Sequence, residues 1–194
     1  VWNMKKITSL IIVFSMLVAM LACFDVSTAF AATNGNCGAN FGGTNAKWSL
    51  NTSTGVLTIS GKGATKDCGN VGSNQAPWKD SRDKIKSIVV EEGITALGRY
   101  MFYKCEVAES VSLPSTLTAI GDTKFLEYGT FVDCKALTNV TLPSKLQTIG
   151  HAAFKGCTSL KSIKIPDSVT TIGTSAFEDC TALSTVTFGT GVNE

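Results

Sequence analysis

Residues Thr130 to Phe188 read TFVDCKALTNVTLPSKLQTIG, then HAAFKGCTSLKSIKIPDSVTTIG, then TSAFEDCTALSTVTF. A cysteine recurs every 23 residues in this stretch, and a phenylalanine three residues before it keeps the same spacing. A fixed period of this length is typical of a solenoid, in which each unit buries its apolar face only against its neighbours. The sequence therefore predicts a stack of short repeats.

One full unit, residues 151–173, predicts the local structure of the stack. Phe154 and Cys157 are three residues apart, which places them on one side of a short helical turn. The alternating segment 162–165 predicts a strand with one buried face, and Pro166 ends it because proline has no N–H for the ladder. A second short extended piece ends at Gly173, where we expect an unusual backbone conformation or a close approach.

The N-terminal residues 1–31 have the pattern of a secretory signal peptide. A basic head that begins at Met4 precedes an apolar run, and Ala29-Phe30-Ala31 supplies the small residues of a cleavage site. Two alternatives remain open, namely a membrane anchor and a lipoprotein that uses Cys23. Under each of the three interpretations the protein acts outside the cytoplasm.

Residues 32–84 are rich in Gly, Asn, Thr and Ser and predict an N-terminal β-rich cap. The runs KWSL and GVLTISG, separated by NTSTG, indicate a hairpin with Gly55 at the end of its turn. Such a cap would cover the sheet edge of the first repeat. Trp48 and Trp78 would pack inside it, and the alternative is an aromatic binding surface. The segment around Lys79 to Lys84 predicts one short helical turn.

Residues 85–194 carry the repeats, and their pattern IG…AF..C..L..I.IP..V..IG resembles the BspA-type (Treponema pallidum-type) leucine-rich repeat of bacterial surface proteins. The segment before them is similar to the lead-in found with such repeats in Gram-positive gut bacteria. The resemblance implies an α/β repeat fold: a β-rich leucine-rich-repeat solenoid of short parallel strands and short helical turns. It also implies a secreted or wall-attached protein that acts in adhesion and protein binding, with no catalytic motif.

Six extra residues interrupt the period between Gly121 and Phe131. This insertion carries Phe125, Leu126 and Tyr128, which makes these three side chains the candidate contacts for a partner, since insertions in repeat arrays often lie on binding faces. The alternative is that Phe125 and Leu126 fold back on the core as one extra helical turn. The period is also incomplete after Val192, which predicts an N-terminal fragment of a longer, monomeric chain with an exposed apolar edge.

The remaining residues offer little for chemistry. Cys105, Cys134, Cys157 and Cys180 share one repeat position and are expected to be small buried hydrophobes, whereas Cys37 and Cys68 flank the hairpin and could form a disulfide. A lone histidine, His151, is expected to be a solvated side chain in a turn. We predict no metal, no cofactor, no catalysis and no nucleic-acid partner.

Two functional hypotheses follow. The first is a surface-displayed module that binds a host or bacterial surface protein or a glycan. The second is a structural stalk, or the non-catalytic arm of a larger secreted enzyme.

Overall fold

The computed structural model describes residues 33–124 and 129–189. Within these ranges strands dominate, and the helices are three short 3₁₀ segments that all precede the repeats: η1 (Phe41–Gly43), η2 (Gly72–Asn74) and η3 (Lys79–Lys84). The last of these is the short helical turn that the sequence predicts. The expected signal peptide over residues 1–31 lies outside the described residues.

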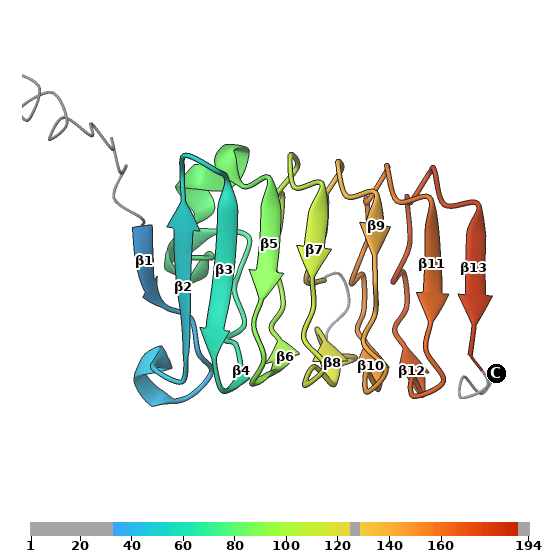
Figure 1. Cartoon of the computed structure of the whole chain (residues 1–194), viewed down its shortest axis with the longest axis horizontal. Helices are drawn as coiled ribbons and strands as arrows, with labels where there is room; N and C mark the ends of the chain where they lie inside the picture. The colour runs from blue at the N-terminus through green and yellow to red at the C-terminus, as the bar shows by residue number, and fades with distance from the viewer. Residues whose placement is uncertain (1–32, 125–128, 190–194) are drawn as a thin grey trace, which may run out of the picture. The chain divides into compact units, whose positions relative to one another are not determined.

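The larger sheet has eight strands in the order β1-β2-β3-β5-β7-β9-β11-β13 (Figure 1). The first three pair antiparallel, and every pairing from β3 onward is parallel. The bounds of these strands are β1 Thr33–Asn36, β2 Ala46–Asn51, β3 Val56–Gly61, β5 Ser87–Val90, β7 Ser110–Ser112, β9 Asn139–Val140, β11 Ser162–Ile165 and β13 Thr185–Phe188.

The smaller sheet has five parallel strands in the order β12-β10-β8-β6-β4. They are β4 (Gly63–Ala64), β6 (Ile94–Leu97), β8 (Ala119–Ile120), β10 (Thr148–Ile149) and β12 (Thr171–Ile172). Each complete repeat thus contributes one strand to each sheet, as the two predicted extended pieces require. The predicted α/β repeat fold, a β-rich leucine-rich-repeat solenoid of short parallel strands, is confirmed.

A stack of aromatic rings runs through the core along the repeats. The rings of Phe102, Phe131, Phe154 and Phe177 follow one another with centroids 4.9, 5.2 and 5.6 Å apart, and the last two pairs are almost parallel. Trp78 extends this stack on the N-terminal side, 5.9 Å from Phe102. Offset ring pairs at such distances contribute about 0.5–1.5 kcal/mol each beyond the burial of their area.

The cap continues the larger sheet. Its hairpin pairs β2 with β3 from Ala46↔Gly61 to Asn51↔Val56, and β3 then pairs with β5 of the first repeat. Trp48 and Trp78 are both buried, with their rings in edge contact at 5.5 Å. Both tryptophans therefore contribute to packing, and neither forms an aromatic binding surface.

The predicted helical turn of each repeat is a series of i→i+3 turns. Cys157 donates its backbone N–H to the Phe154 carbonyl, while the N–H of Phe154 itself donates across to Ala176 of the next unit. This alternation of bonds within and between units requires a left-handed residue just before each cysteine. Lys104, Asp133, Gly156 and Asp179 hold that place, with φ between 57° and 72°.

In two of the units, the glycine that ends the unit lies tightly against the backbone of a neighbouring unit. A Cβ on Gly150 would lie 2.5 Å from the Asp122 carbonyl oxygen, and one on Gly173 would lie 2.3 Å from the His151 nitrogen. Neither has a positive φ, so the predicted close approach, rather than an unusual conformation, explains both glycines.

Candidate binding surfaces

The outward side chains of the larger sheet form one row per repeat position. In one such row, each residue pairs with the next across the strands, and all members have a hydroxyl or amide side chain: Ser87, Ser110, Asn139, Ser162 and Thr185. The Ser110 hydroxyl lies 3.1 Å from that of Ser87. We call the face that carries this row the open face. None of the five residues of this row belongs to the packed core.

The open face contains a cleft between β9 and β11. Asn139↔Ser162 is the single register pair that joins these strands, whereas β11 forms four pairs with β13. A cleft of about 470 Å³ lies next to this pair. It is lined by Asn139, Val140, Thr141, Leu142, Ser144, Ser162, Ile163, Lys164 and Pro166.

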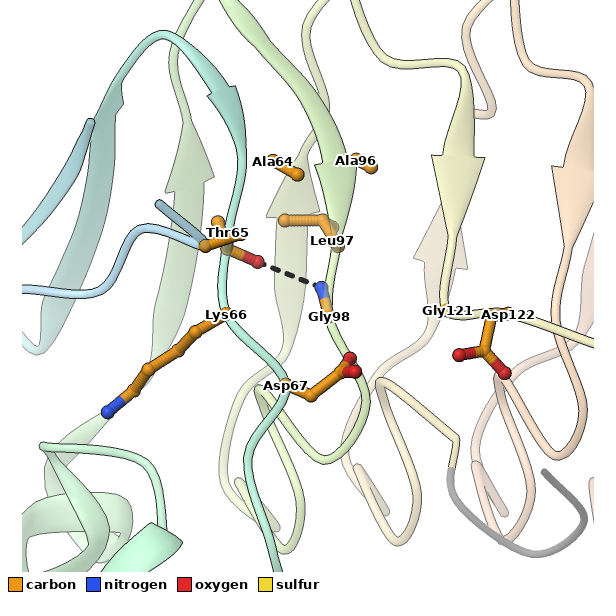
Figure 2. Close-up of a pocket in the computed structure, with 10 residues that line it drawn as sticks. Ala64, Thr65, Lys66, Asp67, Ala96, Leu97, Gly98, Gly121 and Asp122 are labelled. Atoms are coloured by element: carbon orange, nitrogen blue, oxygen red, sulfur yellow. Dashed lines mark hydrogen bonds between the residues drawn. The ribbon is translucent and has the colours of Figure 1, made fainter. Parts of the chain in front are cut away.

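A second pocket, of about 380 Å³, lies where the cap meets the first repeats. Alanine and glycine residues of β4, β6 and the segment after β8 form much of its lining, and Lys66, Asp67 and Asp122 supply the charges. Figure 2 shows the carboxylate of Asp67 below Gly98, pointing toward the side on which Asp122 lies, while Lys66 points away from both.

The charges of this second pocket are engaged with one another. Arg99 places Nη2 at 2.9 Å from Asp67 and Nε at 3.6 Å from Asp122, so one guanidinium forms an ion pair with each of the two carboxylates. Asp67 also accepts the backbone N–H of Arg99. This network holds the cap against the first repeats and is better explained as a structural contact than as a ligand site.

The insertion after Gly121 begins and ends in well-defined contacts. On its first side, the Asp122 carbonyl accepts the N–H of His151, whose ring Nε2 lies 2.7 Å from the Thr123 carbonyl oxygen. Since a carbonyl can only accept, Nε2 carries the proton. On its other side, the buried Thr130 hydroxyl donates to the Gly98 carbonyl at 3.1 Å. The prediction that His151 is a solvated side chain is therefore wrong, because its ring anchors this segment.

The three candidate contacts Phe125, Leu126 and Tyr128 lie outside the described residues. Their part in binding stays a prediction, and so does the alternative that two of them pack on the core.

The six cysteines among residues 33–124 and 129–189 are free and buried, which confirms the packing role predicted for the four in the repeats. Cys134, Cys157 and Cys180 each direct their thiol to the carbonyl of the phenylalanine one unit back, at 3.3, 3.3 and 3.1 Å. Cys37 and Cys68 are separate thiols. Burial raises the pKa of Cys37 to about 12 and that of Cys68 to about 11.

Other chemical features are sparse. Glu92 accepts the backbone N–H of Ser115 at 2.8 Å, and this bond lowers the pKa of the Glu92 carboxyl. Glu92 therefore joins two units rather than only solvating the surface.

Within residues 33–124 and 129–189, no group of three or more His, Cys, Asp or Glu side chains is arranged to hold a metal ion. The same ranges contain no helix that is long and apolar enough to cross a membrane.

The parallel strands, the two-sheet repeat and its packed Phe and Cys positions define a leucine-rich-repeat protein. Residues 124–194 match the family model of the BspA type leucine rich repeat region, with six copies. Residues 124–194 are thus similar to repeats of the BspA type, and the resemblance predicted from the sequence is confirmed.

Solved structures of bacterial proteins share the fold. A leucine-rich repeat protein from Eubacterium ventriosum is 27% identical with a TM-score of 0.58, and the match covers 82% of this chain and 45% of that one. One from Bacteroides ovatus is 26% identical with a TM-score of 0.52, covering 72% and 39%. The T. pallidum leucine-rich repeat protein is 24% identical with a TM-score of 0.51, covering 72% and 66%, and shows likeness in fold alone.

The chain spans less than half the length of the E. ventriosum and B. ovatus proteins. No significant match is found among curated proteins.

Proposed function

We propose that the chain is a secreted or cell-surface binding module that mediates adhesion and protein–protein interaction and performs no catalysis. One observation carries the proposal: the side chains that define the repeat are used in packing, while the open face from β5 to β13 lies outside the packed core. A surface of this kind is typical of repeat proteins that bind through an extended face.

The partner would be a host or bacterial surface protein or a glycan. The chain has 17 Lys and Arg against 15 Asp and Glu, so it lacks the strong positive charge on which nucleic-acid binding depends. Its export would follow from the predicted leader at residues 1–31. BspA-type repeats support a surface location, because the resemblance implies proteins displayed outside the cell.

The insertion supplies the candidate contacts for a protein partner. Phe125, Leu126 and Tyr128 include two aromatic side chains, and aromatic residues are the commonest energetic centres of protein interfaces.

A binding screen tests this function. The purified protein would be passed over immobilised extracellular-matrix proteins and mucin, with surface plasmon resonance as the readout. We expect saturable binding to at least one of them. The double variant F125A/Y128A should weaken binding to a protein without lowering the melting temperature. A large loss of stability in that variant would instead place these side chains in the core.

Uniform absence of binding would contradict the proposal. It would favour the alternative, a structural stalk or the non-catalytic arm of a larger secreted enzyme.

A further inference from the structure

The cleft between β9 and β11 differs from the rest of the open face because the sheet is interrupted there. β9 has only two residues and ends at Val140, while β11 continues to Ile165 and keeps its full pairing with β13. The interruption exposes the edges of side chains that otherwise point into the core. As a result this part of the face has depth, and its volume of about 470 Å³ falls within the range of small-ligand sites.

The lining of the cleft combines an apolar floor with a polar rim. Val140, Leu142 and Ile163 are almost fully buried and form the floor together with Pro166. The rim is formed by exposed side chains that carry hydroxyl, amide or amine groups: Asn139, Thr141, Ser144, Ser162 and Lys164. The hydroxyl and amide groups can both donate and accept hydrogen bonds, whereas the ammonium group of Lys164 only donates them.

We propose that this cleft binds an oligosaccharide, and that Lys164 selects a sugar with a carboxylate. A pyranose ring has hydroxyl groups around its edge and C–H groups on its faces, which match the rim and the floor. Lys164 is the one charged residue in the lining, so it offers an ion pair to an acidic sugar. The inference rests on the proposed binding function and names its ligand class.

The composition of the open face favours a glycan over a protein at this place. Protein interfaces are rich in aromatic residues, Met and Arg and poor in Ser and Lys. The outward positions of the sheet near the cleft show the reverse, with Ser110 and Ser112 on β7, Ser162 and Lys164 on β11, and Thr185 on β13. Such a face lacks the large anchors of a protein hot spot but can form a hydrogen-bond array with hydroxyl groups.

Calorimetric titration with two matched hexasaccharides tests the proposal. Chitohexaose is uncharged, whereas a hyaluronan hexasaccharide alternates N-acetylglucosamine with glucuronate and so carries carboxylates. We expect the protein to bind the hyaluronan fragment more tightly. Lys164→Gln should weaken that binding about tenfold, as for loss of a charged hydrogen bond, and leave chitohexaose binding unchanged.

Asn139→Ala combined with Ser162→Ala should weaken both sugars. Ser110→Ala is the matched control, because Ser110 pairs with Asn139 in the same row but does not line the cleft. The control should retain wild-type affinity, and equal melting temperatures would show that each variant is folded.

Each remaining outcome contradicts the proposal in a different way. If neither sugar binds at millimolar concentration but a matrix protein does, the ligand class is wrong and the binding function stands. If a sugar binds with equal affinity to the cleft variants, the site is wrong. Absence of binding to sugars, matrix proteins and mucin alike would overturn the proposed function as well.

Discussion

The position before the cysteine contributes to the closure of the turn in each repeat. Its φ is positive in all four repeats, although it is occupied by Lys104, Asp133, Gly156 and Asp179. Left-handed backbone is unfavourable by about 1–2 kcal/mol for residues with a Cβ, less so for Asn and Asp, and Gly adopts it without this cost. The choice of Asp and Gly at three of these positions follows from that cost, and Lys104 is the exception.

Gly156→Ala should therefore destabilise the protein by about 1–2 kcal/mol. The φ of Gly156 is 72°, and a Cβ would lie 2.5 Å from Oδ1 of Asp133, a side chain that can turn away. Gly72→Ala is the matched control, because Gly72 has a φ of 71° and no atom near the added methyl. Urea denaturation of both variants separates the conformational cost from the contact. If Gly156→Ala were neutral while Gly72→Ala was not, the left-handed turn would not matter in the repeat.

The buried thiols predict a loss of stability at alkaline pH. Burial raises the pKa of Cys37 to about 12, Cys68 to about 11 and Cys105 to about 12. In the unfolded chain a thiol ionises near pH 8.5, so above about that pH the unfolded state loses protons that the folded state keeps. The free energy of unfolding should fall by about 1.4 kcal/mol per pH unit for each such thiol, until the folded pKa is reached.

Urea midpoints measured between pH 7.5 and 10.5 would show this slope as an alkaline loss. In Cys105→Ala the slope should be smaller by the share of one thiol, even though the variant is less stable at every pH. A slope that stays the same in this variant would contradict the assignment. Stability that does not change above pH 9 would contradict the burial of all three thiols.

At the scale of the elements, the repeats can be predicted well from the sequence because every unit makes the same packing contacts. Phe154 and Cys157 on one turn, the alternation of Ile163 and Ile165, and the strand end at Pro166 all follow from local rules and are found. The cap hairpin is likewise predicted from its turn residues. Gly173 is predicted to mark an unusual backbone conformation or a close approach, and the structure shows the close approach.

Features that depend on contacts between units are less accessible from the sequence. The 23-residue register places Lys79 opposite Phe102, yet Trp78, one residue earlier, takes the place in the ring stack. The anchor role of His151 depends on Thr123, 28 residues away. The cleft lies beside the short pairing of β9, which no local sequence pattern indicates. The left-handed turn, in contrast, could have been predicted from the Asp or Gly before three of the cysteines.

The stack of rings predicts that the stability lost on replacing one of its phenylalanines by alanine depends on the position of that phenylalanine in the stack. Phe131 is fully buried between Phe102 and Phe154, so Phe131→Ala should lower the free energy of unfolding by about 3–5 kcal/mol. Phe177 stacks on Phe154 and is only half-buried, so Phe177→Ala should cost clearly less. Chemical denaturation measures both. Equal losses at the two positions would show that the rings do not act as a graded stack.

At the scale of the whole molecule, the two ends of the larger sheet differ. At the cap the sheet continues through β3, β2 and β1, with Trp48 and Trp78 buried beneath it. At the other end all four residues of β13 are exposed, and Phe188 is 59% exposed. Because each unit of a solenoid is held mainly by its nearest neighbours, stability should vary along the stack.

Hydrogen exchange measured by NMR should reveal this variation. Among the described strands, amides of β13 should exchange fastest, and protection should rise through β11 to the middle strands β5 and β7, because β13 is paired only with β11. Trp78→Ala removes the link between the cap and the ring stack, so it should speed exchange in β3 and β5 more than in β11. A conservative Trp78→Phe should restore most of the protection, since a ring remains to stack on Phe102. Uniform protection from β3 to β13, changed equally by both variants, would mean that the repeats and the cap unfold as a single cooperative unit.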